Sequence, residues 1–314
     1  MNLDFNKDRL NKLINEISPK NILIHKDHMK NLNYFIENPS ATSCIKTSDL
    51  RYTQGENREC EKYDLVIYIA DSYEPQEILL KTINEYIKKN SLIFIGEMKS
   101  AKSILKKYDC QKRFHTGKFF VGHIKQQNSD NIKIEQHKIT ETLKDVNMTF
   151  QTEKGLFSYK KIDEGTKFLL ENIDINEEDE VLDFACGYGA IGLIYAKKHP
   201  KSKIVMTDSK IKAIQYAKKN AKLNNIQNVE IKNAYLLKGI DGKYDKIISN
   251  PPTHMNLYEV KDLIKKFKEL IKDKGEIFLI INKIVDYERY AKKYFKEITI
   301  ENQNEQYKII KLKK

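Results

Sequence analysis

The stretch IISNPPTH places Asn250 directly before two prolines, Pro251 and Pro252, at the end of an apolar run. Proline fixes its own φ and drives the preceding residue into an extended conformation, so the backbone at Asn250 is restricted at the tip of a strand. An exocyclic NH2 group of a base or an amide is a poor nucleophile because its lone pair is delocalised. The carbonyls of Asn250 and Pro251 can each accept one N–H of such a group and orient its lone pair toward an electrophile. The stretch therefore predicts either transfer onto a planar amine or a plain strand stop.

A second stretch, VLDFACGYGAIG at 181–192, has glycines where a strand turns into a helix. Gly187, Gly189 and Gly192 match the spacing GxGxxG, which lets a backbone approach a ligand at a helix N-terminus. Asp208 follows Gly189 by 19 residues and ends the next apolar run. A carboxylate in this place can accept both ribose hydroxyls of an adenosine, so the spacing predicts a nucleotide-like cofactor.

The neighbouring polar residues indicate which adenosine cofactor is bound. Asp183 precedes the glycines, and a buried carboxylate there needs backbone N–H groups or a cationic ligand as partners. Asn233 ends the third strand, beside the expected place of an adenine edge. An NAD enzyme gains nothing from Asn-Pro-Pro beside its cofactor, whereas a methyltransferase acting on a planar amine does. We therefore expect S-adenosylmethionine as the cofactor.

These residues fall at the ends of elements that alternate between strand and helix. Strands separated by helices form right-handed βαβ units, and open parallel sheets bind ligands at the carboxyl ends of their strands. The pattern predicts an α/β fold with a doubly wound, mostly parallel, Rossmann-like sheet. We expect strands at 180–185, 202–208, 229–233, 244–250 and 276–282, and helices at 190–198, 209–224 and from Val260 to a stop at Gly275. The tail from 306 to 314 reads as a last strand, either parallel or antiparallel.

The first half of the chain reads as a degenerate copy of the second. EKYDLVIYIADSYEP at 61–75 parallels GKYDKIISNPPTHM at 242–255, with Ala70-Asp71-Ser72 in place of Asn-Pro-Pro. KKNSLIFIGE at 88–97 parallels KDKGEIFLIIN, and no glycine loop follows the early apolar strand NILIH. We expect a methyltransferase-like N-terminal domain without a cofactor site at 1–135, ending in a polar linker at 126–135, and a catalytic domain at 136–314.

Composition limits the class of protein. The chain has 314 residues, 40% hydrophobic and 32% charged, with no apolar run of membrane-spanning length and no secretory signal at its N-terminus. Four cysteines without a CxxC pair argue against a zinc site or a disulfide framework and favour a reducing cytoplasm. The net charge is +12, with 24 Lys and Arg against 20 Asp and Glu before residue 151 and 32 against 24 after it. This charge fits a polyanionic partner such as RNA, or only a lysine-rich composition.

Three motifs together carry a family resemblance: GLFSYKKIDEGTKFLLEN at 155–172, the glycine stretch, and ISNPPTH. They resemble the ribosomal-RNA guanine-N2 methyltransferases of the RsmC/RlmG group and their small archaeal relatives, and the two-domain members of that group have a duplicated architecture. The resemblance implies a class I S-adenosylmethionine-dependent enzyme that acts on RNA. It also implies roles for residues: Phe157, Ser158, Asp163 and Thr166 would close over the cofactor, Ala185, Gly187 and Gly189 would cradle its methionine part, Asp208 would hold its ribose, and Asn250 would hold the target amine.

The sequence departs from this family at two positions. Ala185 stands where a glycine is usual, which should narrow the loop slightly. Thr253 stands where an aromatic side chain usually stacks on the target base, so the stacking would come from Tyr188, Tyr258 or Phe157. His254 matches the NPPFH pattern of the family, and a structural role for it is the commoner alternative to substrate binding.

Other functions remain open at this stage. A protein-glutamine methyltransferase or another RNA or DNA amino-methyltransferase would also use Asn-Pro-Pro. A non-catalytic RNA-binding assembly factor is a further alternative, although the intact set of Gly187, Gly189, Asp208 and Asn250 favours an enzyme. We expect a monomer that acts on ribosomal RNA, with neither a metal nor a membrane as partner.

Overall fold

The chain divides into two compact units, Met1–Ile134 and Glu135–Lys314. The expected linker up to residue 134 and the expected helix around Leu79 and Ile83 lie outside the described residues. The computed structural model describes residues 9, 12–14, 16, 21–25, 44–48, 65–69, 92–97, 110–116, 119–124, 135–252, 255, 257–282 and 287–314.

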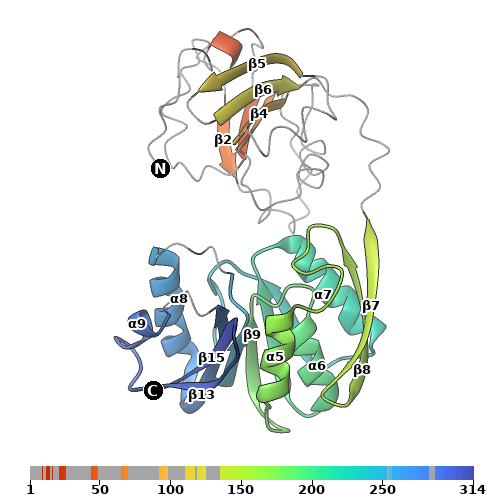
Figure 1. Cartoon of the computed structure of the whole chain (residues 1–314), viewed down its shortest axis with the longest axis vertical. Coiled ribbons are helices and arrows are strands. Elements are labelled where there is room, and N and C mark those ends of the chain that lie inside the picture. The colour runs from red at the N-terminus through yellow and green to blue at the C-terminus, as the bar shows by residue number, and fades with distance from the viewer. Residues whose placement is uncertain are drawn as a thin grey trace. The chain divides into compact units, whose positions relative to one another are not determined.

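The second unit is built on a mostly parallel sheet of strand order β11-β10-β9-β12-β13-β15-β14 (Figure 1). Strands β11, β10, β9, β12 and β13 pair in parallel, and β15, the strand expected in the tail, adds antiparallel to β13. The mostly parallel α/β sheet predicted from the sequence is therefore confirmed. The strands are β9 (Glu180–Phe184), β10 (Lys203–Asp208), β11 (Val229–Asn233), β12 (Tyr244–Ser249), β13 (Ile271–Asn282), β14 (Glu297–Gln303) and β15 (Tyr307–Lys313).

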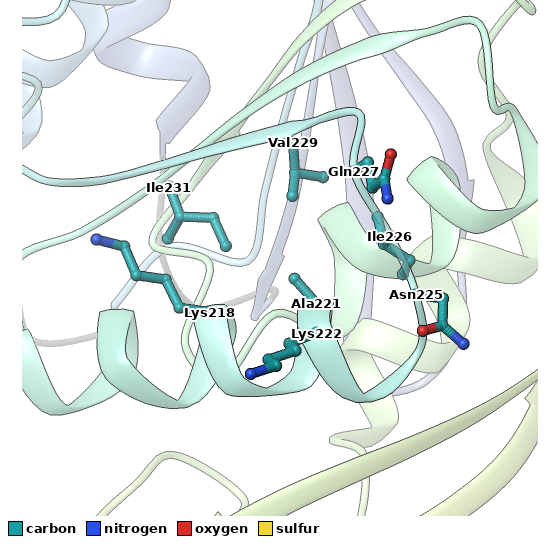
Figure 2. A pocket seen from close by; sticks show the side chains of 8 residues that line it. All are labelled: Lys218, Ala221, Lys222, Asn225, Ile226, Gln227, Val229 and Ile231. Carbon is teal, nitrogen blue, oxygen red and sulfur yellow. The ribbon is translucent and has the colours of Figure 1, made fainter.

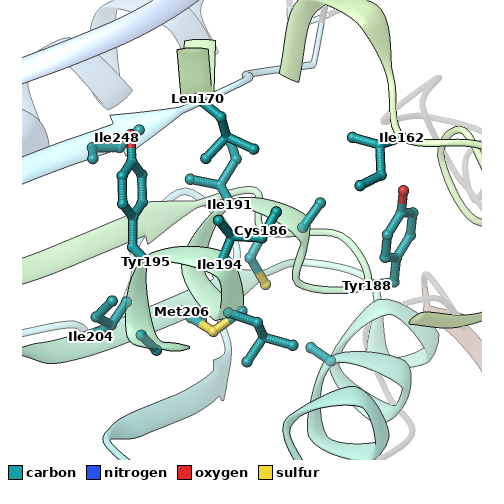
Figure 3. Close-up of a cluster of buried hydrophobic side chains, with 14 of the residues drawn as sticks. Ile162, Leu170, Cys186, Tyr188, Ile191, Ile194, Tyr195, Ile204, Met206 and Ile248 are labelled. Carbon is teal, nitrogen blue, oxygen red and sulfur yellow. The ribbon is translucent and has the colours of Figure 1, made fainter. Parts of the chain in front are cut away.

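Both faces of this sheet are covered, which is why its strands read as continuous apolar runs. In β9, Val181 packs into the cluster on one face, and Leu182 and Phe184 pack into the cluster on the other. Figure 3 shows part of the first cluster, to which Tyr195 of α6 and Ile248 of β12 both belong. Helices α5 (Glu164–Asn172), α6 (Ala190–Lys198) and α7 (Ile211–Leu223) cover the first face, and α8 (Leu257–Leu270) and α9 (Tyr287–Ala291) cover the second.

A two-stranded hairpin, β7 (Gln136–Leu143) and β8 (Val146–Glu153), packs on α7 outside the central sheet. Its turn residues Lys144 and Asp145 both have positive φ, which suits the twist of a two-residue hairpin. The sequence analysis did not predict this hairpin, nor β14, α5 or α9.

One boundary in the sequence analysis was wrong. Gly275 does not end α8, because the helix stops at Leu270 and β13 already begins at Ile271. The pairing of β12 with β13 is irregular between Tyr244 and Lys246, and a Cβ at Gly275 would lie 2.9 Å from the Asp245 carbonyl oxygen. Glycine is needed there because two backbones approach closely at an irregular strand pairing.

The first unit has a sheet of strand order β2-β1-β3-β4-β6-β5. Strands β2, β1, β3 and β4 pair in parallel, while β6 and β5 add antiparallel at one side. This order repeats β10-β9-β12-β13-β15-β14 of the second unit, without a counterpart of β11 among the described residues. The strands are β1 (Asn21–His25), β2 (Cys44–Ser48), β3 (Leu65–Ile69), β4 (Leu92–Glu97), β5 (Cys110–Thr116) and β6 (Phe119–Ile124).

Candidate active site

The glycine loop after β9 lies against the end of β10. The N–H of Cys186 donates to the Thr207 carbonyl at 2.9 Å, and the N–H of Gly187 donates to Oδ2 of Asp208 at 2.9 Å. The N–H of Lys210 donates to Oδ1 of the same carboxylate at 2.8 Å. An ionised carboxylate has about four acceptor positions, so Asp208 keeps about two of them for other donors.

The backbone of this loop needs residues that tolerate positive φ. Gly187 has φ 57° and Gly189 has φ 102°, and Ala185 adopts φ 60° although it carries a Cβ. A Cβ at Gly187 would face open space, whereas a Cβ at Gly189 would lie 2.7 Å from the Leu193 side chain. The N-cap residue Gly189 has no side chain to cap α6, and the first turn receives a side-chain acceptor only at the N–H of Gly192, from Asp183.

Asp183 is a fully buried carboxylate one strand away from Asp208. Its Oδ2 accepts the N–H of Gly192 at 2.8 Å, while its Oδ1 has no hydrogen-bond partner among the described residues. Burial raises the pKa of Asp183 to about 8, the Gly192 hydrogen bond lowers it, and the charge of Asp208 raises it further. Burial also raises the pKa of Asp208. The loop thus faces two carboxyl groups that form no ion pair within the described part of the chain, and Oδ1 of Asp183 has no hydrogen-bond partner there.

The side chain of Asn250 is held by residues from a distant part of the chain. Its Nδ2 donates to Oδ2 of Asp163 and to Oγ1 of Thr166, both at 3.0 Å. Asp163 also caps α5, because the same Oδ2 accepts the Thr166 N–H at 3.1 Å. The NH2 end of the amide is therefore occupied, and its carbonyl oxygen points away from these two partners. The preceding residue, Ser249, donates its hydroxyl proton to the Phe184 carbonyl at 2.6 Å and links the end of β12 to β9.

The other predicted cofactor residues lie at the carboxyl edge of the sheet or in the segment that precedes α5. Asn233 lies at the carboxyl end of β11, where its Nδ2 donates to the carbonyls of Asp208 and Ser209 at 2.9 and 3.0 Å. Phe157 is 62% exposed, and the Ser158 hydroxyl donates to the Lys161 carbonyl at 2.7 Å.

Directly after Asn250, Pro251 is buried and Pro252 is exposed. Tyr258 is the second residue of α8 and is 79% exposed. Thr253 and His254 lie outside the described residues.

Tyr188 does not lie at the surface. Its side chain is 4% exposed and packs edge-on against Phe150 of β8, with ring centroids 5.6 Å apart. Asn220 of α7 donates to the Tyr188 carbonyl at 2.9 Å and fixes the backbone of the glycine loop from below. A ring in this position offers no open face to a base. The sequence analysis did not single out Asn220, whose only signal is an amide on the apolar side of an amphipathic helix.

A hollow of about 420 Å³ lies elsewhere, between the second half of α7 and the start of β11 (Figure 2). It faces the amino ends of the parallel strands, opposite the edge that carries Asn250 and Asp208. Within the described residues, no group of three or more His, Cys, Asp or Glu side chains could hold a metal ion. None of the helices in this part of the chain has both the length and the apolar character needed to cross a bilayer. Within the described residues, the polar side chains that could bind a cofactor or a substrate therefore lie at the carboxyl edge of the parallel sheet.

Comparisons with known proteins agree with this architecture. The T. thermophilus 16S rRNA N2 methyltransferase (RsmC), solved in complex with AdoMet and guanosine, superposes with a TM-score of 0.74. It is 16% identical, and the match covers 94% of this chain and 88% of that one. At this identity the likeness concerns the fold, which is a methyltransferase fold.

Curated relatives are similar over most of their length. Ribosomal RNA small subunit methyltransferase C of Haemophilus influenzae (strain PittGG) is 28% identical, with 80% of this chain and 79% of the relative covered. The protein of the same name from Pseudoalteromonas atlantica is 29% identical, with 74% and 72% covered. The model of the family described as "Methyltransferase small domain" matches residues 147–311, which hold the glycine loop, Asp208 and Asn250. The chain therefore belongs to the methyltransferase small domain family.

Proposed function

We propose that this chain is an S-adenosylmethionine-dependent methyltransferase that methylates the N2 amine of a guanine in ribosomal RNA. The relatives named ribosomal RNA small subunit methyltransferase C support the reaction and the RNA class. The RsmC structure with AdoMet and guanosine supports the choice of cofactor and base.

The orientation of the Asn250 amide is the observation that carries this proposal. Because Asp163 and Thr166 occupy its NH2 group, only the Oδ1 acceptor is left to face a substrate. The guanine N2 amine is a donor that needs an acceptor, and the Pro251 carbonyl supplies a second one. Together these acceptors hold the amine and stabilise the positive charge that develops on nitrogen during transfer.

The residues of the glycine loop fit a cationic cofactor better than a dinucleotide. S-Adenosylmethionine carries a sulfonium and an ammonium group, and it supplies an electrophilic methyl group. Asp183 has a buried oxygen without a partner, which an ammonium group satisfies. Asp208 has acceptor positions left for ribose hydroxyls, and Asn233 leaves its Oδ1 for an adenine amine. The anionic pyrophosphate of NAD would instead meet two carboxylates beside the loop.

In this proposal each group of the chain has a definite task. Gly187 keeps the loop open for close approach of the methionine part, since nothing lies within 4 Å of a Cβ built there. Ala185 and Gly189 form the two ends of the same turn, and Phe157 and Ser158 lie on the segment that would cover the cofactor. Asn250 and Pro251 orient the amine, and Pro252 stiffens the turn. No protein base has to remove a proton before transfer, because the amine becomes acidic only once it is methylated.

We further propose that Met1–Ile134 is a degenerate copy of the catalytic unit that has no cofactor site of its own. The shared strand order supports a duplication. Ala70-Asp71-Ser72 in the place of Asn-Pro-Pro supports the loss of catalysis. This unit would hold RNA for the catalytic unit.

Methyl-labelled S-adenosylmethionine tests this assignment. The full chain is incubated with the labelled cofactor and either total RNA or ribosomal proteins from cells that lack this enzyme. The proposal requires label in the RNA. Label only in protein would favour an amide methyltransferase, and RNA binding without any transfer would favour an assembly factor.

A further inference from the structure

The exposed side of α8 carries a row of lysines headed by an aromatic side chain. Tyr258, Lys261, Lys265 and Lys268 follow one another at intervals of three, four and three residues, which places them along one helical face. The acidic residues of the helix, Glu259, Asp262 and Glu269, lie along the adjacent row of the exposed side together with Lys266, which pairs with Glu269 at 3.5 Å. The buried residues of α8 lie on the other side of the helix and pack on the sheet. The lysines therefore form a continuous row at one side of a second row of mixed charge.

Aromatic rings alternate with the cations of the lysine row. The Lys261 ammonium lies 5.9 Å from the ring centroid of Tyr258 and 5.8 Å from that of Tyr290. The Lys268 ammonium lies 5.4 Å from the centroid of Phe295. Since Tyr290 belongs to α9 and Phe295 follows it, the lysine row runs along the seam between α8 and α9, which Figure 1 shows side by side.

Two lysines of this row have no ion-pair partner among the described residues. Neither Lys261 nor Lys265 forms an ion pair with any described residue, and both are exposed. Burial lowers the pKa of Lys268, and the nearby charges of Lys314 and Lys296 lower it further. The surface therefore holds an excess of cations that a polyanion would neutralise.

The row starts at the edge of the sheet that carries the candidate active site. In a parallel sheet the helix after a strand begins at that strand's carboxyl end, so the start of α8 lies at the same edge as Asn250. Tyr235, which is 37% exposed and follows β11, donates its hydroxyl proton to Glu259 and brings a second ring to this edge. From Tyr258 to Lys268 the helix rises about 15 Å away from the edge.

We propose that this surface, Tyr258 with Lys261, Lys265 and Lys268, binds the single-stranded RNA that flanks the target nucleotide. Tyr258 stacks on a neighbouring base, and the lysines contact successive phosphates. Base stacking on an exposed ring combined with a line of cations is the general way in which proteins hold single-stranded nucleic acid. The inference rests on the proposed RNA substrate and adds the path that the RNA takes away from Asn250.

The phosphate contacts are tested by the salt dependence of RNA binding. The double variant Lys261→Ala/Lys265→Ala is compared with Lys218→Ala/Lys222→Ala, two exposed lysines of α7 that line the hollow in Figure 2. The probe is a fluorescent single-stranded RNA of about 20 nucleotides that contains guanines, titrated with the full chain from 50 to 200 mM salt. The slope of log K against log salt should shrink by about 1.4 for the α8 variant, or about 0.7 for each lost contact, and stay unchanged for the α7 control. An unchanged slope in the α8 variant, or an equal loss in both, overturns the proposed path.

Stacking is tested separately with Tyr258. Tyr258→Ala should weaken binding of the same RNA by about 5-fold to 150-fold, the usual range for one stacked base, while Tyr258→Phe should bind like the wild type. Equal affinity of Tyr258→Ala and wild type contradicts stacking.

S-Adenosylmethionine affinity, measured by calorimetry, should be the same in all of these variants, which shows that each is folded. If the wild type transfers methyl groups to RNA and the α8 variants match it throughout, only this inference fails. If the wild type neither binds nor methylates RNA, the proposed function itself fails.

Discussion

The amide of Asn250 shows at the scale of one residue how a remote segment can set the chemistry of a motif. Its NH2 group is shared by Asp163 and Thr166, both at the start of α5 and more than 80 residues earlier in the chain. A free amide can turn by 180° and present either end to a substrate. Turning the amide would set its oxygen against the carboxylate oxygen of Asp163, which can only accept, and this is unfavourable. These two residues therefore act as positioning residues for the acceptor.

Replacing Thr166 tests this positioning. Thr166→Val keeps the shape of the side chain but removes the hydroxyl acceptor, so we expect methyl transfer to slow by about 2-fold to 10-fold, the scale of one hydrogen bond. Thr166→Ser keeps the hydroxyl and should restore the rate, while S-adenosylmethionine affinity stays the same in both. Single-turnover rates at saturating cofactor measure this. A rate for Ser as low as that for Val would point to packing instead.

Asp183 gives a prediction about pH. Its pKa is about 8 in the folded chain and near 3.9 when unfolded, so between pH 4 and pH 8 the folded state holds a proton that the unfolded state has lost. The free energy of unfolding should therefore fall as pH rises through this window, by at most about 1.4 kcal/mol per pH unit from this group, and level off above pH 8. The Asp183→Asn variant has no titrating carboxyl group at this position, so its free energy of unfolding should lack this contribution to the pH dependence.

Urea unfolding at pH 5, 6.5, 8 and 9 compares the two proteins without cofactor. The variant should become progressively more stable relative to the wild type from pH 5 to pH 8, and the difference should then stay constant. Parallel curves would mean that Asp183 is ionised throughout.

The sequence predicts which residues lie close together when each of them directly follows a strand of the parallel sheet. The glycine loop, Asp208 and Asn250 follow successive strands, so the parallel sheet alone predicts that they meet at one edge. The contact of Asn250 with Asp163 depends on how α5 packs, which no local pattern reports. Tyr188 sits in a glycine-rich turn that looks exposed, and the sequence does not show that Phe150 of an unpredicted hairpin covers it.

At the scale of elements, the β7–β8 hairpin is held to α7 by two asparagines in place of a strand partner. Asn220 accepts the Gln151 N–H at 2.8 Å and donates to the carbonyls of Gln151 and Tyr188 at 3.1 and 2.9 Å. Asn224 accepts the Thr149 N–H at 3.0 Å and donates to its carbonyl at 2.8 Å. The hairpin, the helix and the glycine loop thus share one polar network. Asn220 lies inside α7 although asparagine is a poor helix former, so its presence there reflects these bonds, whereas Asn224 is the C-cap residue of the helix.

The two asparagines should differ in importance. Asn220 is fully buried and serves three backbone groups, so Asn220→Ala should lower the free energy of unfolding by about 2–4 kcal/mol, because the buried groups lose their partners. Asn224 is less buried, and water can replace it, so Asn224→Ala should cost about 1 kcal/mol. Urea unfolding of both variants measures the difference. A larger loss for Asn224→Ala would contradict the network described here.

At the scale of the whole molecule, the positive charge and the two units suggest how a large substrate is held. The chain carries a net charge of +12, and both halves contribute to the excess. The paired motifs EKYDLVIYIADSYEP and GKYDKIISNPPTHM contain β3 and β12, which take corresponding places in the two strand orders and support the proposed duplication. The sequence did not reveal the antiparallel strands β5 and β6 of the first unit, since a strand's direction depends on partners far along the chain.

This charge predicts that the two ligands respond differently to salt. RNA affinity should fall about tenfold or more between 50 and 200 mM salt, because each phosphate contact contributes about 0.7 to 0.9 to the slope. S-Adenosylmethionine affinity should change by less than about twofold, since its carboxylate partners lie within a partly buried site. Titrations of the full chain with each ligand provide the comparison. An RNA affinity that does not respond to salt would point to a substrate that is not a polyanion.

The identity of the methylated nucleoside tests the central claim most directly. The full chain and its Asn250→Ala variant are incubated with ribosomal RNA that lacks the modification and with methyl-labelled S-adenosylmethionine. The RNA is then digested to nucleosides for mass spectrometry. The account predicts labelled N2-methylguanosine with the wild type, and a single-turnover rate lower by about 100-fold to 1000-fold with Asn250→Ala at unchanged cofactor affinity. Label on another base or atom, or wild-type rates in the variant, would contradict it.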